Sequence, residues 1–263
     1  MIRHVNEVST TTFDYIIIAS KALRNSDSST AELVRPAVSK DTTIVLIQNG
    51  IGIEDEYMEA YPINTLLSCV VYLPATQTRP GYIEMGDLEM LQIGLYPVSD
   101  DEEKIGRRDA FAEVIGRGNG TAKTFHDVQE KRWSKLLVNV GWNPVCALAR
   151  SRDVDVLAAA DEAEDFVKGV MMEVALIAQA FGYEGVNEHE VDRQLDRAKA
   201  RIGTKGIMPS MMHDALHERR MEVDAIVGNT MRLGKQKGIS VPRLEGLYVL
   251  TKALDARFAE AKN

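Results

Sequence analysis

The stretch of sequence from residue 133 to residue 144 reads WSKLLVNVGWNP, and the two halves of the chain on either side of it differ in pattern. In a helix, Lys135, Asn139 and Asn143 lie on one face, each about one turn beyond the last. The residues between them are mostly apolar, which predicts a largely buried helix. One cation and two amides in such a helix are costly unless neighbouring protein groups or a polar ligand satisfy them.

The half of the chain before this stretch alternates apolar runs with helical patterns. Residues 14–19 and 43–47 are short β-branched apolar runs, typical of strands buried on both faces of a sheet. Residues 28–39 predict a helix between them, which Pro36 kinks or ends. The order strand, helix, strand predicts a right-handed parallel crossover.

The pattern changes after Pro74. Residues 81–85 and 90–94 are short strand-like runs on either side of a turn-like Gly86-Asp87, so we predict that they pair as a hairpin. Such a hairpin would make the sheet mixed. The other elements predicted in this half are helices over residues 54–61 and 100–116 and strands over residues 66–72 and 121–125.

From residue 127 onward the pattern is almost entirely helical. The sequence therefore predicts an α/β domain with a mixed, incomplete Rossmann-like sheet over residues 1–126, followed by an all-helical domain over residues 127–263. The predicted helices cover residues 127–149, 153–182, 187–202 and 220–238, with one opening at Pro209-Ser210 and a last one from Pro242 that turns Leu244, Leu247, Leu250 and Leu254 inward.

Composition excludes several classes of function. The net charge is −8 and no run of Lys or Arg stands out, so the electrostatic footprint of a nucleic-acid-binding protein is absent. No apolar run approaches the ~20 residues of a membrane span, and the first residues lack the apolar core of a signal peptide. Cys69 and Cys146 both lie in apolar surroundings, which favours buried reduced thiols over a disulfide. We expect a soluble cytoplasmic protein without a membrane partner.

Polar residues follow two of the predicted strands. Lys21 comes after the first strand, and the turn Gln48-Asn49-Gly50 closes the second. Ligands of open α/β sheets bind outside the carboxyl ends of the strands, which is where these residues are expected. A solvated loop lysine and a simple tight turn are the alternative interpretations.

Other candidate residues lie in the helical half. His213 and His217 have a spacing that could hold zinc, but no third ligand is evident, so a solvated helix face is favoured and no metal site is predicted. Ser210 is equally well explained as a helix cap, and Glu222, taken alone, as a surface glutamate. No Gly-x-Ser-x-Gly elbow or Cys/His pair indicates a covalent nucleophile.

Together these motifs resemble the ketopantoate reductase family, and they cover nearly the whole chain. Each motif alone is weak, whereas their order and spacing are specific. They are a lysine after a buried strand (Lys21), a Q-N-G turn (Gln48-Asn49-Gly50), a K-x-x-x-N-x-x-x-N-P helix (Lys135, Asn139, Asn143, Pro144) and a P-S-M-x-x-D segment (Pro209 to Asp214) followed by Glu222 and Gly228.

The resemblance implies NADPH-dependent reduction of a small 2-oxo acid, ketopantoate by default, to the 2-hydroxy acid. It assigns Lys135 as the general acid, whose burial would lower its pKa toward neutrality. It also implies a helical domain for substrate binding and dimerisation, and hence a homodimer. The implied contacts are substrate orientation by Asn139 and Asn143, carboxylate binding by Ser210, hydroxyl binding by Glu222, and a position between cofactor and substrate for Lys21 and Asn49.

One part of the family pattern is missing. The family opens with a glycine-rich nucleotide fingerprint and a basic residue for the ribose phosphate of NADP, and this chain contains no G-x-G-x-x-G. Three interpretations remain: a shortened form of an ordinary reductase, a natural fragment completed by another chain, or a homologue without redox activity that binds a small acid or a partner. We also expect an exposed sheet edge where further strands would pair.

Overall fold

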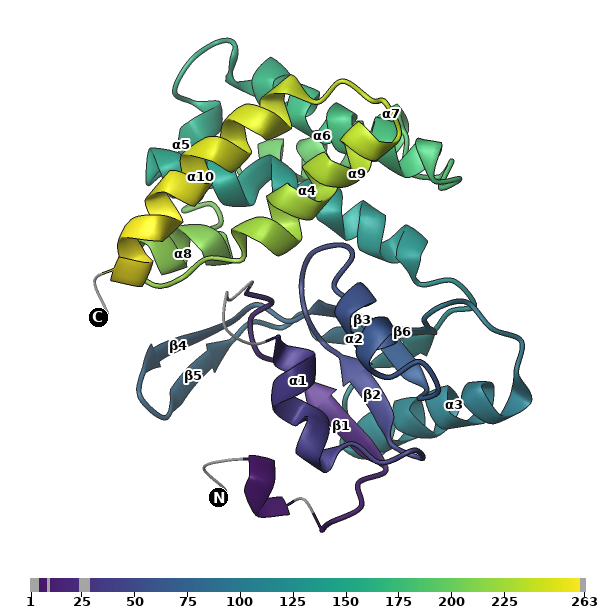
Figure 1. Ribbon diagram of the computed structural model, residues 1–263. Coiled ribbons are helices and arrows are strands. Elements are labelled where there is room, and N and C mark those ends of the chain that lie inside the picture. Colours follow the sequence, from purple (N-terminus) through teal and green to yellow (C-terminus); the bar gives the residue numbers. More distant parts are fainter. Residues whose placement is uncertain (1–4, 9, 24–28, 261–263) are drawn as a thin grey trace. The chain divides into compact units, whose positions relative to one another are not determined.

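The computed structural model of the protein describes residues 5–8, 10–23 and 29–260 (Figure 1). Contacts within the chain divide it into two compact units. The sheet unit comprises Met1–Asn49 and Ile53–Lys131, and the helical unit comprises Gly50–Gly52 and Arg132–Asn263. The short loop Gly50–Gly52 therefore belongs with the helices, although the residues on either side of it belong with the sheet.

The sheet unit is built on a five-stranded mixed sheet with the order β1-β2-β3-β6-β7. β1 and β2 are parallel, as are β2 and β3, whereas β6 runs antiparallel to β3 and parallel to β7. A mixed sheet in the first half of the chain is thus confirmed. The bounds are β1 (Tyr15–Ile18), β2 (Thr43–Leu46), β3 (Leu66–Tyr72), β6 (Met90–Leu95) and β7 (Ala122–Thr124).

Two helices of this unit begin at a side-chain cap, and the first of them ends next to a proline. Ser29 caps the first helix by accepting from the backbone N–H of Glu32, and Asp101 caps α3 in the same way. The first helix gives way to a 3₁₀ turn that contains Pro36, as expected for a proline that ends a helix. The bounds are η1 (Val5–Val8), α1 (Thr30–Val34), η2 (Arg35–Ala37), α2 (Asp55–Ala60) and α3 (Glu102–Arg117).

The predicted hairpin is wrong in its pairing. β5 (Tyr82–Met85) pairs with β4 (Ala75–Arg79), a strand that the sequence did not indicate, and β6 pairs with β3 in the main sheet. The reason is burial: alternate residues of β6 are buried in the core of the sheet unit, whereas every residue of β4 and β5 is exposed. A strand with an apolar inward face is stabilised by the main sheet rather than by an exposed ribbon.

β1 is an edge of the sheet within the described residues, with β2 on one side only. Burial of β1 on both faces was therefore a wrong prediction, since Ile17 is 51% exposed. By contrast, all four residues of β2 are buried. An edge strand such as β1 was expected, because a sheet edge exposes backbone groups that have no strand partner.

The helical unit packs its elements around one apolar core. The central helix α4 supplies Leu136, Leu137 and Val140 to this core, and α6 supplies Val170, Val174 and Ile177. Both cysteines of the chain, Cys69 and Cys146, are buried thiols, as expected. The bounds are α4 (Gln129–Ala149), α5 (Asp153–Leu157), α6 (Ala163–Ala180), α7 (Glu188–Lys199), α8 (Ser210–Leu216), η3 (Asp224–Gly228), α9 (Asn229–Gln236) and α10 (Pro242–Glu260).

The helical predictions need three corrections. The helix predicted over residues 153–182 is two helices, α5 and α6, and the predicted helix over residues 220–238 begins with a π-turn, η3. In α10, Leu250 is 58% exposed, and Thr251 and Asp255 are buried instead. No helix of the described chain is long and apolar enough to cross a membrane.

Candidate active site

α4 carries three of the predicted site residues. Its apolar positions are buried in the core of the helical unit, which fixes the rotation of the helix and thereby the face on which Lys135, Asn139 and Asn143 lie. Asn143 is 5% exposed, and Lys135 and Asn139 are half-buried. The structure thus places the polar stripe as predicted, on one face of a largely buried helix.

The electrostatic surroundings of Lys135 favour proton transfer near neutral pH. Burial lowers the pKa of Lys135, the neighbouring Arg132 guanidinium lowers it further, and the Glu222 carboxylate partly opposes both, so that the pKa falls to about 8. The ammonium group therefore gives up a proton far more readily than that of an exposed lysine. Because the two charges influence each other, the fold also brings Glu222 near Lys135.

Glu222 is buried, with an exposed fraction of 9%, so its interpretation as a surface glutamate is wrong. Its neighbours Met221 and Val223 are buried as well, at 2% and 1%. Neither strand nor helix periodicity buries three successive residues at a surface. The segment that leads into the π-turn η3 does so because it passes through the interior of the helical unit.

Ser210 is the first residue of α8 and is exposed. The N-cap of α8 is Pro209, so the interpretation of Ser210 as the cap is also wrong. The preceding loop is held by Asp153, which accepts from the backbone N–H of Ile207 at 2.7 Å and from Arg201 Nη2 at 2.6 Å. Ser210 is therefore an exposed residue at the start of α8 that does not cap the helix.

His213 of α8 and His217, which directly follows this helix, make contacts with protein groups. His213 Nδ1 lies 2.6 Å from Arg219 Nη2, and His217 Nδ1 lies 2.7 Å from the carbonyl oxygen of His213. Among the residues that the structure describes, no group of three or more His, Cys, Asp and Glu side chains could hold a metal ion.

Lys21 and Asn49 lie in the sheet unit, after the carboxyl ends of β1 and β2. These strands are parallel neighbours, so the two residues follow the same edge of the sheet. Gln48 Nε2 donates to the carbonyl oxygen of Ser20 at 2.8 Å and fastens one turn to the other. The structure therefore brings Lys21 and Asn49 to one edge, with Gln48 as a link that the sequence motif contained but did not explain.

The loop Gly50–Gly52 is fastened to the helical unit by three hydrogen bonds. Arg132 Nη1 donates to the Gly50 carbonyl at 3.0 Å, the Ile51 N–H donates to the Ala225 carbonyl at 3.0 Å, and Asn229 Nδ2 donates to the Ile51 carbonyl at 2.6 Å. Sequence reasoning missed Arg132, although a cation three residues before Lys135 in an apolar helix was a usable signal.

A nicotinamide nucleotide is the cofactor that the sequence resemblance implies. The edge formed by Lys21 and Asn49 lies where open α/β sheets bind such ligands, and its two linked turns offer a cation and an amide. These residues fit the reacting end of the nucleotide. The chain contains no G-x-G-x-x-G loop, so the residues present identify no cradle for the diphosphate.

Comparison with known proteins gives a consistent result over most of the chain. Residues 2–97 match the family model described as Ketopantoate reductase PanE/ApbA, and residues 127–255 match Ketopantoate reductase PanE/ApbA C terminal. The 2-dehydropantoate 2-reductase of Nostoc sp. is 26% identical over 247 residues, which are 93% of this chain and 75% of the relative.

Solved structures agree with these matches. The 2-dehydropantoate 2-reductase from Methylococcus capsulatus is similar at 29% identity and a TM-score of 0.79, over 98% of this chain and 79% of that one. The corresponding enzyme from Geobacter metallireducens gives 27% identity and a TM-score of 0.83, over 96% of this chain and 80% of that one. With both halves of the chain matched in order by the two family models, and with the fold shared along nearly its whole length, the protein belongs to the ketopantoate reductase family.

Proposed function

We propose that the protein reduces a small 2-oxo acid, ketopantoate or a similar compound, to the 2-hydroxy acid with NADPH, with Lys135 as the general acid. The broader class, an oxidoreductase, follows from membership of the family. The observation that carries the finer proposal is the half-buried Lys135, whose pKa is lowered to about 8 and which has Glu222 nearby. A lysine so placed suits proton donation to a carbonyl oxygen.

The proposed reaction assigns a role to each residue. NADPH, when bound, would supply the hydride, with its electron pair, that the carbonyl carbon of the substrate accepts. Lys135 donates a proton from Nζ to the carbonyl oxygen, stabilises the developing negative charge there, and afterwards regains a proton from solvent. Asn139 and Asn143 orient the substrate, Ser210 binds its carboxylate, and Glu222 binds its hydroxyl groups. Lys21 and Asn49 contact the reacting end of the nucleotide.

The pH dependence of the reaction tests the role of Lys135. Reduction requires the protonated lysine, so kcat/KM should be constant below about pH 8 and fall roughly tenfold per pH unit above it. Oxidation of the 2-hydroxy acid requires the neutral amine and should show the opposite trend. Initial rates of NADPH consumption and formation across this range measure both. A reduction rate that rises through pH 8 would exclude Lys135 as the acid.

Binding of NADPH tests the proposal as a whole. Titration of the protein with NADPH, followed by nucleotide fluorescence, should give a dissociation constant of about 1 μM to 1 mM, the range typical of enzyme substrates. Turnover should then appear with ketopantoate or another branched 2-oxo acid. No binding at millimolar NADPH, together with binding of the 2-oxo acid alone, would instead favour the alternative of a homologue without redox activity. The homodimer stays a prediction.

A further inference from the structure

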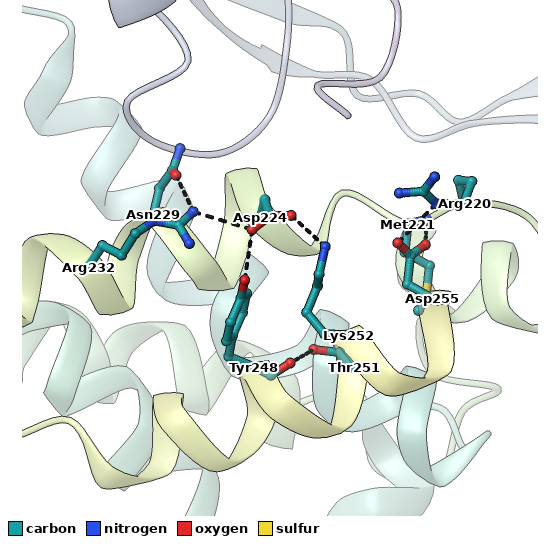
Figure 2. A network of polar contacts seen from close by, with 9 residues as sticks. All are labelled: Arg220, Met221, Asp224, Asn229, Arg232, Tyr248, Thr251, Lys252 and Asp255. Atoms are coloured by element: carbon teal, nitrogen blue, oxygen red, sulfur yellow. Dashed lines mark hydrogen bonds and ion pairs between the residues drawn. The ribbon is translucent and has the colours of Figure 1, made fainter. Parts of the chain in front are cut away.

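The segment that carries Glu222 is held on its N-terminal side by α10. The carboxylate of Asp255, which is 2% exposed, accepts from the backbone N–H of Met221 at 2.7 Å and from Arg220 Nε at 3.0 Å. Figure 2 shows Asp255 beside Arg220 and Met221. The residue directly before Glu222 is therefore fixed through its main chain, and the charge of Asp255 is balanced by Arg220.

The same segment is held on its C-terminal side by a second carboxylate, that of Asp224. It accepts from Lys252 Nζ at 2.8 Å, from the Tyr248 hydroxyl at 3.0 Å and from Arg232 Nη2 at 3.3 Å (Figure 2). Burial alone would raise the pKa of Asp224, but these hydrogen bonds and positive charges outweigh it and lower the pKa below its usual value. Asp224 is therefore ionised at neutral pH.

Apart from the contact of Arg232, which lies on α9, these contacts come from one face of α10. Tyr248, Lys252 and Asp255 are spaced four and three residues apart, the spacing that stacks side chains along a single helix face. Asp255 contacts the residue before Glu222. Tyr248 and Lys252 contact Asp224, which lies two residues after it. α10 thus holds the chain on both sides of Glu222, where Met221 and Glu222 themselves belong to no helix or strand.

The π-turn η3 begins at Asp224, the last residue of this segment. In η3 the backbone N–H of Asn229 donates to the carbonyl of Asp224, five residues earlier. Such turns are rare and often occur at functional sites. Here the carbonyl of Ala225, within the turn, accepts from the N–H of Ile51. The side chain of Asn229 contacts Arg232 at 2.7 Å and Ile51 at 2.6 Å, so one hydrogen-bonded series joins Asp224 to the loop Gly50–Gly52.

We propose that Asp224 and Asp255 are positioning residues that hold Glu222 in place beside Lys135, with α10 as the brace. Both carboxylates are already paired with cations of their own, Arg220 for one and Lys252 and Arg232 for the other. Among residues 220–224, Glu222 is therefore the carboxylate whose charge acts on Lys135. The catalytic consequence rests on the proposed reductase function, whereas the positioning itself is a property of the helical unit.

The test uses the pKa of Lys135 as its readout, because this measurement needs no turnover. The pH-dependent rate of acetylation of Lys135 Nζ, followed by peptide mass spectrometry, gives that pKa in the intact protein. Glu222→Gln should lower it by roughly one pH unit, since a nearby negative charge is lost. Asp224→Asn and Asp255→Asn should each lower it by a measurable part of that amount, because Glu222 is no longer held.

A double-mutant cycle separates positioning from a direct effect of charge. If Asp224 acts through Glu222, then Asp224→Asn should cause no further change in a Glu222→Gln background. Equal changes in both backgrounds would show that the lost charge acts on Lys135 directly and would overturn the proposal, as would an unchanged pKa in both single variants. Glu245→Gln is the matched control, because it removes a carboxylate from α10 that pairs with Lys235, and it should leave the pKa unchanged.

Two further measurements distinguish loss of positioning from loss of folding and from loss of cofactor binding. Circular dichroism identifies a variant that fails to fold, and Tyr248→Phe, which removes only one donor to Asp224, then takes its place with the same expected direction. Where the wild type turns over, the positioning variants should lower kcat with little change in the dissociation constant for NADPH. If the wild type shows no turnover, the proposed function is contradicted. The double-mutant cycle still tests the positioning proposal, because the pKa of Lys135 is measured without turnover.

Discussion

Replacement of Lys135 by alanine is expected to lower the turnover of a 2-oxo acid by about 10²- to 10⁴-fold, the usual contribution of a positioned general acid. The variant loses both the proton donor and the positive charge that stabilises the developing oxyanion. Binding of NADPH should be retained, since Lys21 and Asn49, the proposed nucleotide contacts, lie in the sheet unit. Stopped-flow or steady-state absorbance of NADPH measures the rate, and fluorescence titration measures binding.

Lys131→Ala provides the matched control for this experiment. Lys131 is also a lysine of α4, one turn earlier, but its side chain is 36% exposed and pairs with Glu130. Its removal should leave turnover nearly unchanged. If Lys135→Ala retained the wild-type rate, or if both variants lost turnover equally, Lys135 would not be the acid.

The second large effect is expected for Gly50→Ala. Gly50 has φ +98°, and a Cβ at this position would lie 2.6 Å from the carbonyl carbon of Ala225 and closer still to its oxygen. The neighbour is backbone of the π-turn, so it cannot move aside as a flexible side chain would. Together, the positive φ and the overlap should lower the free energy of unfolding by roughly 2 to 4 kcal/mol, or displace the loop with loss of its hydrogen bonds. Thermal unfolding and amide hydrogen exchange of residues 50–52 measure these outcomes.

Gly182→Ala separates backbone strain from the steric contact. Gly182 lies in the same unit, has a similar φ of +94°, and has open space where a Cβ would be added. It should cost only the strain of the left-handed conformation, about 1 kcal/mol. If Gly50→Ala were as stable as Gly182→Ala, the close contact between Gly50 and the backbone of Ala225 would be contradicted. We also expect slower turnover for Gly50→Ala, because Asn49 is the adjacent residue.

The sequence predicted most elements because their signals are local. The buried strand β2, the approximate bounds of α3, and the long helix α4 with its polar stripe each follow from periodicity within one short stretch. The partner of β6 did not follow, because pairing depends on strands distant in the sequence. The exposure of Leu250 was missed for the same reason, since the inward face of α10 is set by the elements it packs against.

The features of the candidate site likewise fall into those that local sequence predicts and those that depend on tertiary contacts. Local sequence is enough to predict that Lys135, Asn139 and Asn143 lie on one helix face, because helix geometry relates neighbouring residues directly. The tertiary structure alone decided that Glu222 is buried near Lys135, that Arg132 fastens Gly50, and that Asp224 and Asp255 flank Glu222. Burial and charge pairing depend on groups far apart in the chain, and these meet only when the helical unit forms its core.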